Sequence, residues 1–173
     1  RVLNERRRHR DRPFDVHPMP DASLDDLDSL RFEQEYLPAL VARDVLLANN
    51  RSLEQKLAAT KMVQSEVTPV PTVLGLLVCG KSPSDWIFGA YTQFLRIAGT
   101  DLSSPILDEE VMHGTVADQI RRLEEKLEVH NWRKVEFSSV DKEKVEQDYA
   151  LDALRQLVRN AYMHRSYEST NAP

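Results

Sequence analysis

The chain has 173 residues, of which 41% are hydrophobic, enough to build one medium-sized domain or two small ones around a buried core. Its formal net charge of −5 excludes a surface that is basic throughout, the usual footprint of a strong duplex binder. Its single cysteine excludes an internal disulfide and a thiolate metal site, and no stretch approaches the ~20 apolar residues that span a bilayer. We therefore expect a reduced, cytoplasmic protein without a membrane partner.

Residues 1–12 are rich in arginine. They hold six arginines against two acids, and Arg6, Arg7, Arg8 and Arg10 lie almost side by side. Arginine clusters bind phosphate, so this segment is a candidate contact for DNA or RNA. A solvated arm that makes ordinary surface ion pairs explains the same run and remains open.

Residues 13–67 are expected to be mostly helical after a short connector. Three prolines between positions 13 and 20 predict extended chain, and Ser23 with Asp26 has the spacing of a capping box. Apolar residues at helical spacing between positions 32 and 47 predict a stripe that faces the core. Pro38 predicts a break or restart near Leu37.

A second helix is predicted after Ser52, with its apolar side facing the first. This helix carries Leu53, Leu57, Ala58 and Met62 on one side. The two segments together resemble a helical hairpin, for which DNA recognition and simple structural packing are both open.

The character of the chain changes after the proline-rich linker at 68–72. Residues 72–78 are an apolar run that fits a buried helix or a buried strand, and 90–97 alternates as a strand does. Residues 114–130 predict a helix with Val116, Ile120, Leu123, Leu127 and Val129 inward. A strand is expected at 132–137, and a last helix at 149–162 with Leu151, Leu154, Leu157, Val158 and Ala161 on one face.

These elements predict an α+β (mixed α/β) fold. We expect three parts: an arginine-rich arm and connector at 1–20, a helical region at 21–67, and a small α/β region at 68–173. Other motifs are too weak to support a site. Lys81 follows Gly80 without phosphate-loop spacing, the five histidines are scattered, and no serine lies in a nucleophile motif.

Several segments together resemble one protein family. Residues 154–167, LRQLVRNAYMHRSY, closely resemble the run ALREALVNALVHRDYS of the RecG-related helicase-type proteins, also described as transcriptional regulators with a Schlafen-like Alba domain. Residues 71–83 are similar to that family's PTxAGLLLFGKDPQ segment, and 12–27 look like the exit from its Alba-like domain. The likeness covers nearly the whole chain.

The resemblance implies that the last helix is the first motif helix of a divergent histidine-kinase-type ATPase. There the residue matching Asn160 holds Mg²⁺ against the ATP phosphates, and an acid four positions earlier orients the attacking water. Here that position is Gln156, which cannot accept a proton, so ATP binding without turnover, or no ATP binding at all, is expected. His164 and Arg165 are candidate phosphate contacts, although they also suit the negative end of a helix.

We expect only one wall of that ATPase pocket in this chain, so no cofactor here, and ATP with Mg²⁺ only in a longer protein. The leading hypothesis is a regulatory, nucleic-acid-associated module of a RecG-related protein. The alternatives are a scaffold for dimerisation or for neighbouring domains, and a part of a divergent ATPase.

Overall fold

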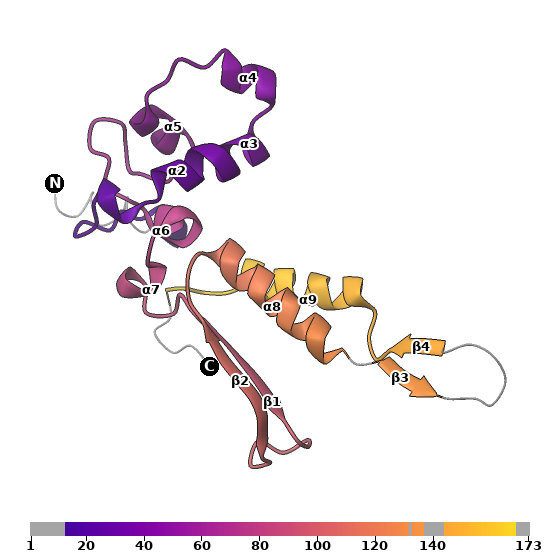
Figure 1. Ribbon diagram of the computed structural model, residues 1–173. Coiled ribbons are helices and arrows are strands. Elements are labelled where there is room, and N and C mark those ends of the chain that lie inside the picture. Colours follow the sequence, from indigo (N-terminus) through magenta and orange to yellow (C-terminus); the bar gives the residue numbers. More distant parts are fainter. Residues whose placement is uncertain (1–12, 132, 137–143, 169–173) are drawn as a thin grey trace. The chain divides into compact units, whose positions relative to one another are not determined.

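A computed structural model of the chain describes residues 13–131, 133–136 and 144–168 (Figure 1). It confirms a small mixed α+β fold. The contacts divide the chain into two compact units. The first contains residues up to Tyr91 with His113–Thr115 and Tyr167, and the second contains Thr92–Met112 and Val116–Ser166.

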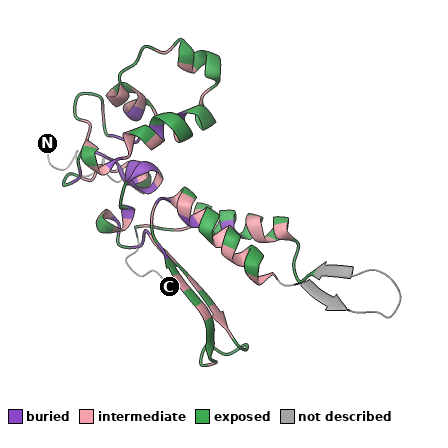
Figure 2. Cartoon of the chain, in the orientation of Figure 1, coloured by how far each residue is buried: buried purple, intermediate pink, exposed green. Residues whose placement is uncertain are grey.

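The first unit is helical and is built around α6 (Val73–Cys79), so the apolar run that left helix and strand open is a helix. Figure 2 shows buried residues concentrated in this helix. The other helices of the unit are α2 (Ser29–Arg31), α3 (Leu37–Leu40), α4 (Arg43–Leu47), α5 (Leu53–Ala59) and α7 (Pro83–Trp86). The core contains Leu27, Phe32, Leu37, Leu57, Met62, Val63, Val73, Leu76, Leu77 and Cys79.

Two residues at the start of α6 explain its position. Thr72 caps the helix, because its Oγ1 accepts a hydrogen bond from the Gly75 amide at 3.0 Å and donates to the Lys61 carbonyl at 2.7 Å. Gly75 lets the backbone of α6 approach residue 62, since a Cβ at position 75 would lie 2.1 Å from the Met62 carbonyl oxygen. The packing of α6 against residues 61 and 62 therefore depends on the Thr72 hydroxyl and on the absence of a side chain at Gly75.

The predicted capping box of Ser23 and Asp26 is confirmed at a 3-10 turn, Leu24–Asp26. Ser52 caps α5 as predicted, and Gln55 completes a second capping box there that was not predicted. Met62 lies beyond the end of α5, where it is fully buried.

Pro38 is accommodated differently from the prediction. The backbone stays helical through Leu37, because a π-helical turn at Phe32–Tyr36 leads into α3 with Pro38 in its first turn. The break comes at Val41, which is extended. The predicted core-facing stripe is wrong from Leu40 onward, since Leu40, Val45 and Leu47 are exposed.

The second unit begins with an antiparallel hairpin, β1 (Thr92–Ile97) and β2 (Ile106–Met112). Phe94 pairs with Glu110 and Arg96 with Asp108, and then the register shifts, which leaves Leu107 as an extra residue on β2. The sequence predicted β1 but not β2.

Two helices accompany this hairpin. They are α8 (Val116–His130), which follows Gly114 at a positive φ of 108°, and α9 (Leu151–Met163), which packs beside α8 (Figure 1). A second hairpin, β3 (Arg133–Glu136) and β4 (Lys144–Gln147), connects them; β3 was predicted and β4 was not. The predicted inward position of Val129 is wrong, because Val129 is exposed. Leu157 and Ala161, predicted on one face of the helix with Val158, are exposed, whereas Val158 is buried.

Candidate functional site

The predicted site residues of the last helix fall into two groups. Gln156, Asn160 and His164 are exposed and follow one another at intervals of four, so they share the outer face of α9 and its C-cap. Arg165 does not join them. It is partly buried, and its Nη1 lies 3.5 Å from Oγ1 of Thr92 in β1.

Arg165 belongs to a buried polar network inside the second unit. Thr92 Oγ1 donates to Oε1 of Gln119 at 2.9 Å, and the Tyr162 hydroxyl lies 2.5 Å from Thr92 Oγ1. Because the Thr92 proton is directed to Gln119, Tyr162 is the donor of the second bond. Gln119 has no exposed surface, and burial raises the pKa of Tyr162. This network connects β1, α8 and α9.

A cluster of charges joins the other half of the hairpin to α8. Lys126 Nζ lies 2.9 Å from Asp108 Oδ2 and 3.1 Å from Glu110 Oε2, and Arg122 Nη2 lies 2.7 Å from Glu110 Oε1. The hydrogen bond from Lys126 is the main cause that lowers the pKa of both carboxyl groups. In turn Asp108, followed by Glu110, raises the pKa of Lys126.

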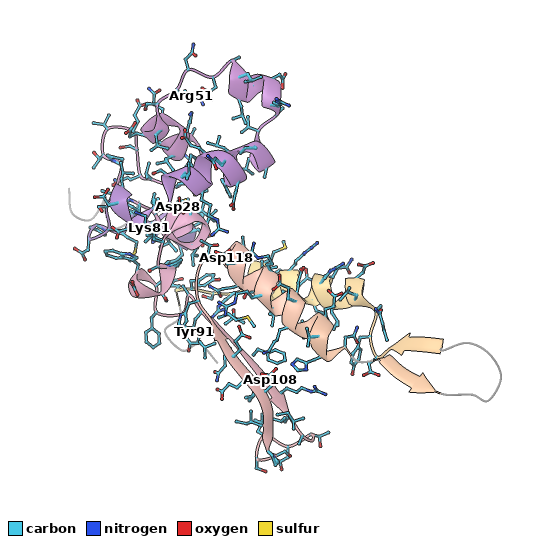
Figure 3. All side chains as sticks on the ribbon, in the orientation of Figure 1. Asp28, Arg51, Lys81, Tyr91, Asp108 and Asp118 are labelled. Atoms are coloured by element: carbon cyan, nitrogen blue, oxygen red, sulfur yellow. The ribbon has the colours of Figure 1, made fainter. Side chains whose placement is uncertain are left out.

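His130, the last residue of α8, extends this cluster to β1. Arg96 Nη1 lies 2.8 Å from Nδ1 of His130, and His130 Nε2 lies 2.5 Å from Asp108 Oδ2. A guanidinium only donates, so Nδ1 accepts and the ring proton sits on Nε2, facing Asp108. The His130 ring also stacks on Phe94, with centroids 5.4 Å apart and planes 8° apart. Figure 3 shows Asp108 on the hairpin and side chains in the space between the hairpin and α8.

The arginines of α9 are turned toward α8. Arg159 Nε lies 3.3 Å from Glu124 Oε1, and Arg155 lies within 3.9 Å of Glu124 and Glu128. The cationic groups of this helix therefore balance acids of its neighbour. The outer face of α9 instead presents amides, an imidazole and apolar groups, with Leu157 at 65% and Met163 at 77% exposure.

The chemistry of the outer face is that of hydrogen bonding. Gln156 and Asn160 offer amide donors and acceptors, and neither accepts a proton at neutral pH. Within the described ranges no three histidine, cysteine or carboxylate side chains gather as a metal site would require. Arg6, Arg7, Arg8 and Arg10, the predicted nucleic-acid contacts, lie outside the described residues.

Sequence reasoning missed the residues that organise the second unit. Asp108 and Glu110 are two positions apart on β2, and Arg122, Lys126 and His130 recur at intervals of four on α8. These two spacings are a detectable signal, since they place two cations and an imidazole on one helix face and two acids on one strand face. The signal becomes specific only once β2 is recognised as a strand.

Comparison of the chain with known protein families, with curated proteins and with solved structures gave no significant match. In the described part of the chain, no helix has the length and apolar character needed to cross a membrane.

Proposed function

We propose that this chain is a regulatory interaction module of a RecG-related protein and that its second unit is the surface for a protein partner. The supporting observation is a hairpin whose outer face is partly apolar. The face of β1 and β2 that meets α8 carries Phe94 and Met112 beside the charged Arg96, Asp108 and Glu110, while the opposite face carries Leu95 and Val111, each 42% exposed, beside Gln93 and Glu109.

This arrangement departs from the usual pattern of a hairpin packed on a helix. Antiparallel strands ordinarily turn apolar residues to the helix and polar residues to water. Here both faces are mixed: ion pairs lie beside Phe94 and Met112 on the face that meets α8, and exposed apolar side chains lie on the outside, including Leu107 at 59% and Leu157 at 65% exposure. Single exposed apolar residues are common, but their recurrence on the outer faces of two elements is typical of an interaction surface.

The test is site-specific photo-crosslinking in cells that produce the protein. A photoreactive amino acid at Leu157 is expected to crosslink to a partner, and the same probe at Glu125, an exposed polar position of α8, serves as the matched control. Equal crosslinking at both positions, or none at Leu157, contradicts the proposal.

Nucleic-acid association is a second candidate, supported by the six arginines of residues 1–12 in a chain that is acidic as a whole. Weak binding of a labelled oligonucleotide that falls steeply with added salt is expected, because phosphate contacts release counterions. Replacing Arg6, Arg7, Arg8 and Arg10 together with glutamine should remove most of it. Unchanged affinity in that variant rules this route out.

A nucleotide role in a longer protein is a third candidate. It is supported by Gln156 and Asn160, which lie on one exposed helix face as the family resemblance requires. A longer chain that continues beyond Pro173 is expected to bind Mg²⁺ and ATP without hydrolysis, since Gln156 replaces the acid. Absence of binding in a calorimetric titration contradicts this candidate.

A further inference from the structure

The two strands of the β1–β2 hairpin differ in how their outer edges are protected. Within the part of the chain that the structure describes, the sheet has only these two strands, so each has one edge without a neighbouring strand. Edge strands with unpaired backbone groups are templates for another strand, and proteins usually block them with charges, bulges or proline. A hairpin of two strands is also marginal by itself.

The β2 edge carries such protection. Asp108, Glu109 and Glu110 are consecutive, and the extra residue Leu107 interrupts the register. Asp108 and Glu110 are balanced by Lys126 and Arg122 of α8, so Glu109 on the outer face is the acid that a second copy of this edge would bring near its own counterpart, and like charges on adjacent strands are destabilising. Self-pairing through β2 is therefore disfavoured.

The β1 edge lacks these features. Its six residues, Thr92–Ile97, contain one charge, Arg96, whose guanidinium is directed to His130 on the helix-facing side. Its outward positions carry Gln93, which donates to Glu109 at 2.9 Å, and the apolar Leu95. The register along β1 is regular from Thr92 to Arg96. This edge is uncharged on its outer face and open to pairing.

We infer that β1 pairs with β1 of a second copy of this chain, which gives a four-stranded antiparallel sheet in the order β2, β1, β1 and β2. A two-fold axis perpendicular to the sheet relates the two copies, so α8 covers the same face in both and the Leu95 side chains of the two copies meet on the opposite face. Leu95 lies near this axis. The inference rests on the proposed interaction role and names the partner.

Cysteine crosslinking tests the pairing directly. Leu95→Cys is expected to form an intermolecular disulfide under mild oxidation, because facing positions of antiparallel strands have the Cα separation that a disulfide needs. Val111→Cys is the matched control, since Val111 has the same 42% exposure on the same face but lies on β2. Cys79, the chain's own cysteine, is buried and does not compete. Equal crosslinking of the two variants overturns the inference.

Sedimentation equilibrium of the full chain provides the second measurement. The unmodified protein is expected to dimerise reversibly, Leu95→Lys to raise the dimer dissociation constant by about tenfold or more, and Val111→Lys to leave it nearly unchanged. Circular dichroism confirms the folding of each variant. A monomer at every concentration overturns the β1 pairing. If photo-crosslinking at Leu157 persists in that case, the proposed function survives. Loss of both the dimer and the crosslinking contradicts the β1 pairing and the proposed function together.

Discussion

The imidazole of His130 donates its Nε2 proton to Asp108 over 2.5 Å, which ties the last residue of α8 to β2. Because Arg96 donates to the other ring nitrogen, this one side chain joins a helix to both strands of the hairpin. Lys126, one turn earlier, bridges Asp108 and Glu110. Ion pairs therefore contribute to the contact between the hairpin and α8, and their contribution should depend on pH.

Replacing Lys126 with methionine should lower stability most near neutral pH. The lowered pKa values of Asp108 and Glu110 stabilise the fold above about pH 4, and this contribution is lost as the pH falls through those lowered values. The raised pKa of Lys126 stabilises the fold below about pH 10 and is lost as the pH rises through it. Urea unfolding of both proteins from pH 3 to 11 measures the difference, and a difference that is constant with pH contradicts this account.

Thr92→Val should destabilise the second unit by about 1–3 kcal/mol, because it leaves the buried Gln119 carbonyl and the Tyr162 hydroxyl without their shared partner. Thr100→Val, at an exposed position, is the control. Denaturant unfolding gives the free energies. A double-mutant cycle with Tyr162→Phe should show a coupling of about 0.5–3 kcal/mol, whereas strict additivity would mean that the two hydroxyls act independently.

Adding one methyl group at Gly75 should be costly. Gly75→Ala places a Cβ against the Met62 carbonyl oxygen, so the backbone of α6 or of residue 62 must shift, at a cost of about 1–3 kcal/mol or more. Gly89→Ala is the matched control, since a Cβ there meets nothing within 4 Å. Thermal unfolding of the two variants should separate them clearly; similar midpoints would show that α6 does not approach residue 62 this closely.

Two adjacent residues of α9 should respond oppositely to truncation. Val158 is 5% exposed, so Val158→Ala should cost about 1–3 kcal/mol, while Leu157, at 65% exposure, should change stability by less than about 0.5 kcal/mol when replaced by alanine. Chemical denaturation reports both values. The reverse order would mean that the helix is rotated and that the outer face described for Gln156 and Asn160 is wrong.

The thiol of Cys79 should be inert in the folded protein. Burial is the main cause that raises its pKa to about 12, and Asp28 adds to the effect. A chromogenic disulfide reagent at pH 8 should therefore react with no thiol until denaturant is added, and then with one per chain. Fast labelling of the native protein would show that α6 opens readily.

The sequence predicted the long elements of the fold and failed where charge replaces apolar packing. Helices α8 and α9 were found because their apolar residues recur at helical spacing, yet Val129 was placed inward and Leu157 on the same face as Val158, although Val129 and Leu157 are exposed. The predicted apolar stripe of α8 has the right helical period but covers too much of the helix, because Lys126 and His130 occupy part of the surface that contacts the hairpin. Strand β2 was missed since Asp108, Glu109 and Glu110 hide its alternation.

The sequence located the candidate site residues at the last helix, but it did not predict which of them lie together. Intervals of four correctly placed Gln156, Asn160 and His164 on one exposed face. Arg165 was assigned to the same group because it is adjacent to His164, but the chain has left the helix there and turns this side chain toward Thr92, 73 residues earlier. Helical periodicity holds only inside a helix, and contacts this distant in sequence have no local signature.

The junction between α8 and α9 has a further consequence. The side-chain amide of Asn131 donates to the Tyr149 carbonyl at 2.8 Å and accepts from the Tyr149 amide at 3.0 Å, so it closes the base of the intervening segment as a backbone pair would. The entropy of closing a loop grows slowly with its length. With the base fastened in this way, the pairing of α8 and α9 should depend little on the length of the segment that connects them.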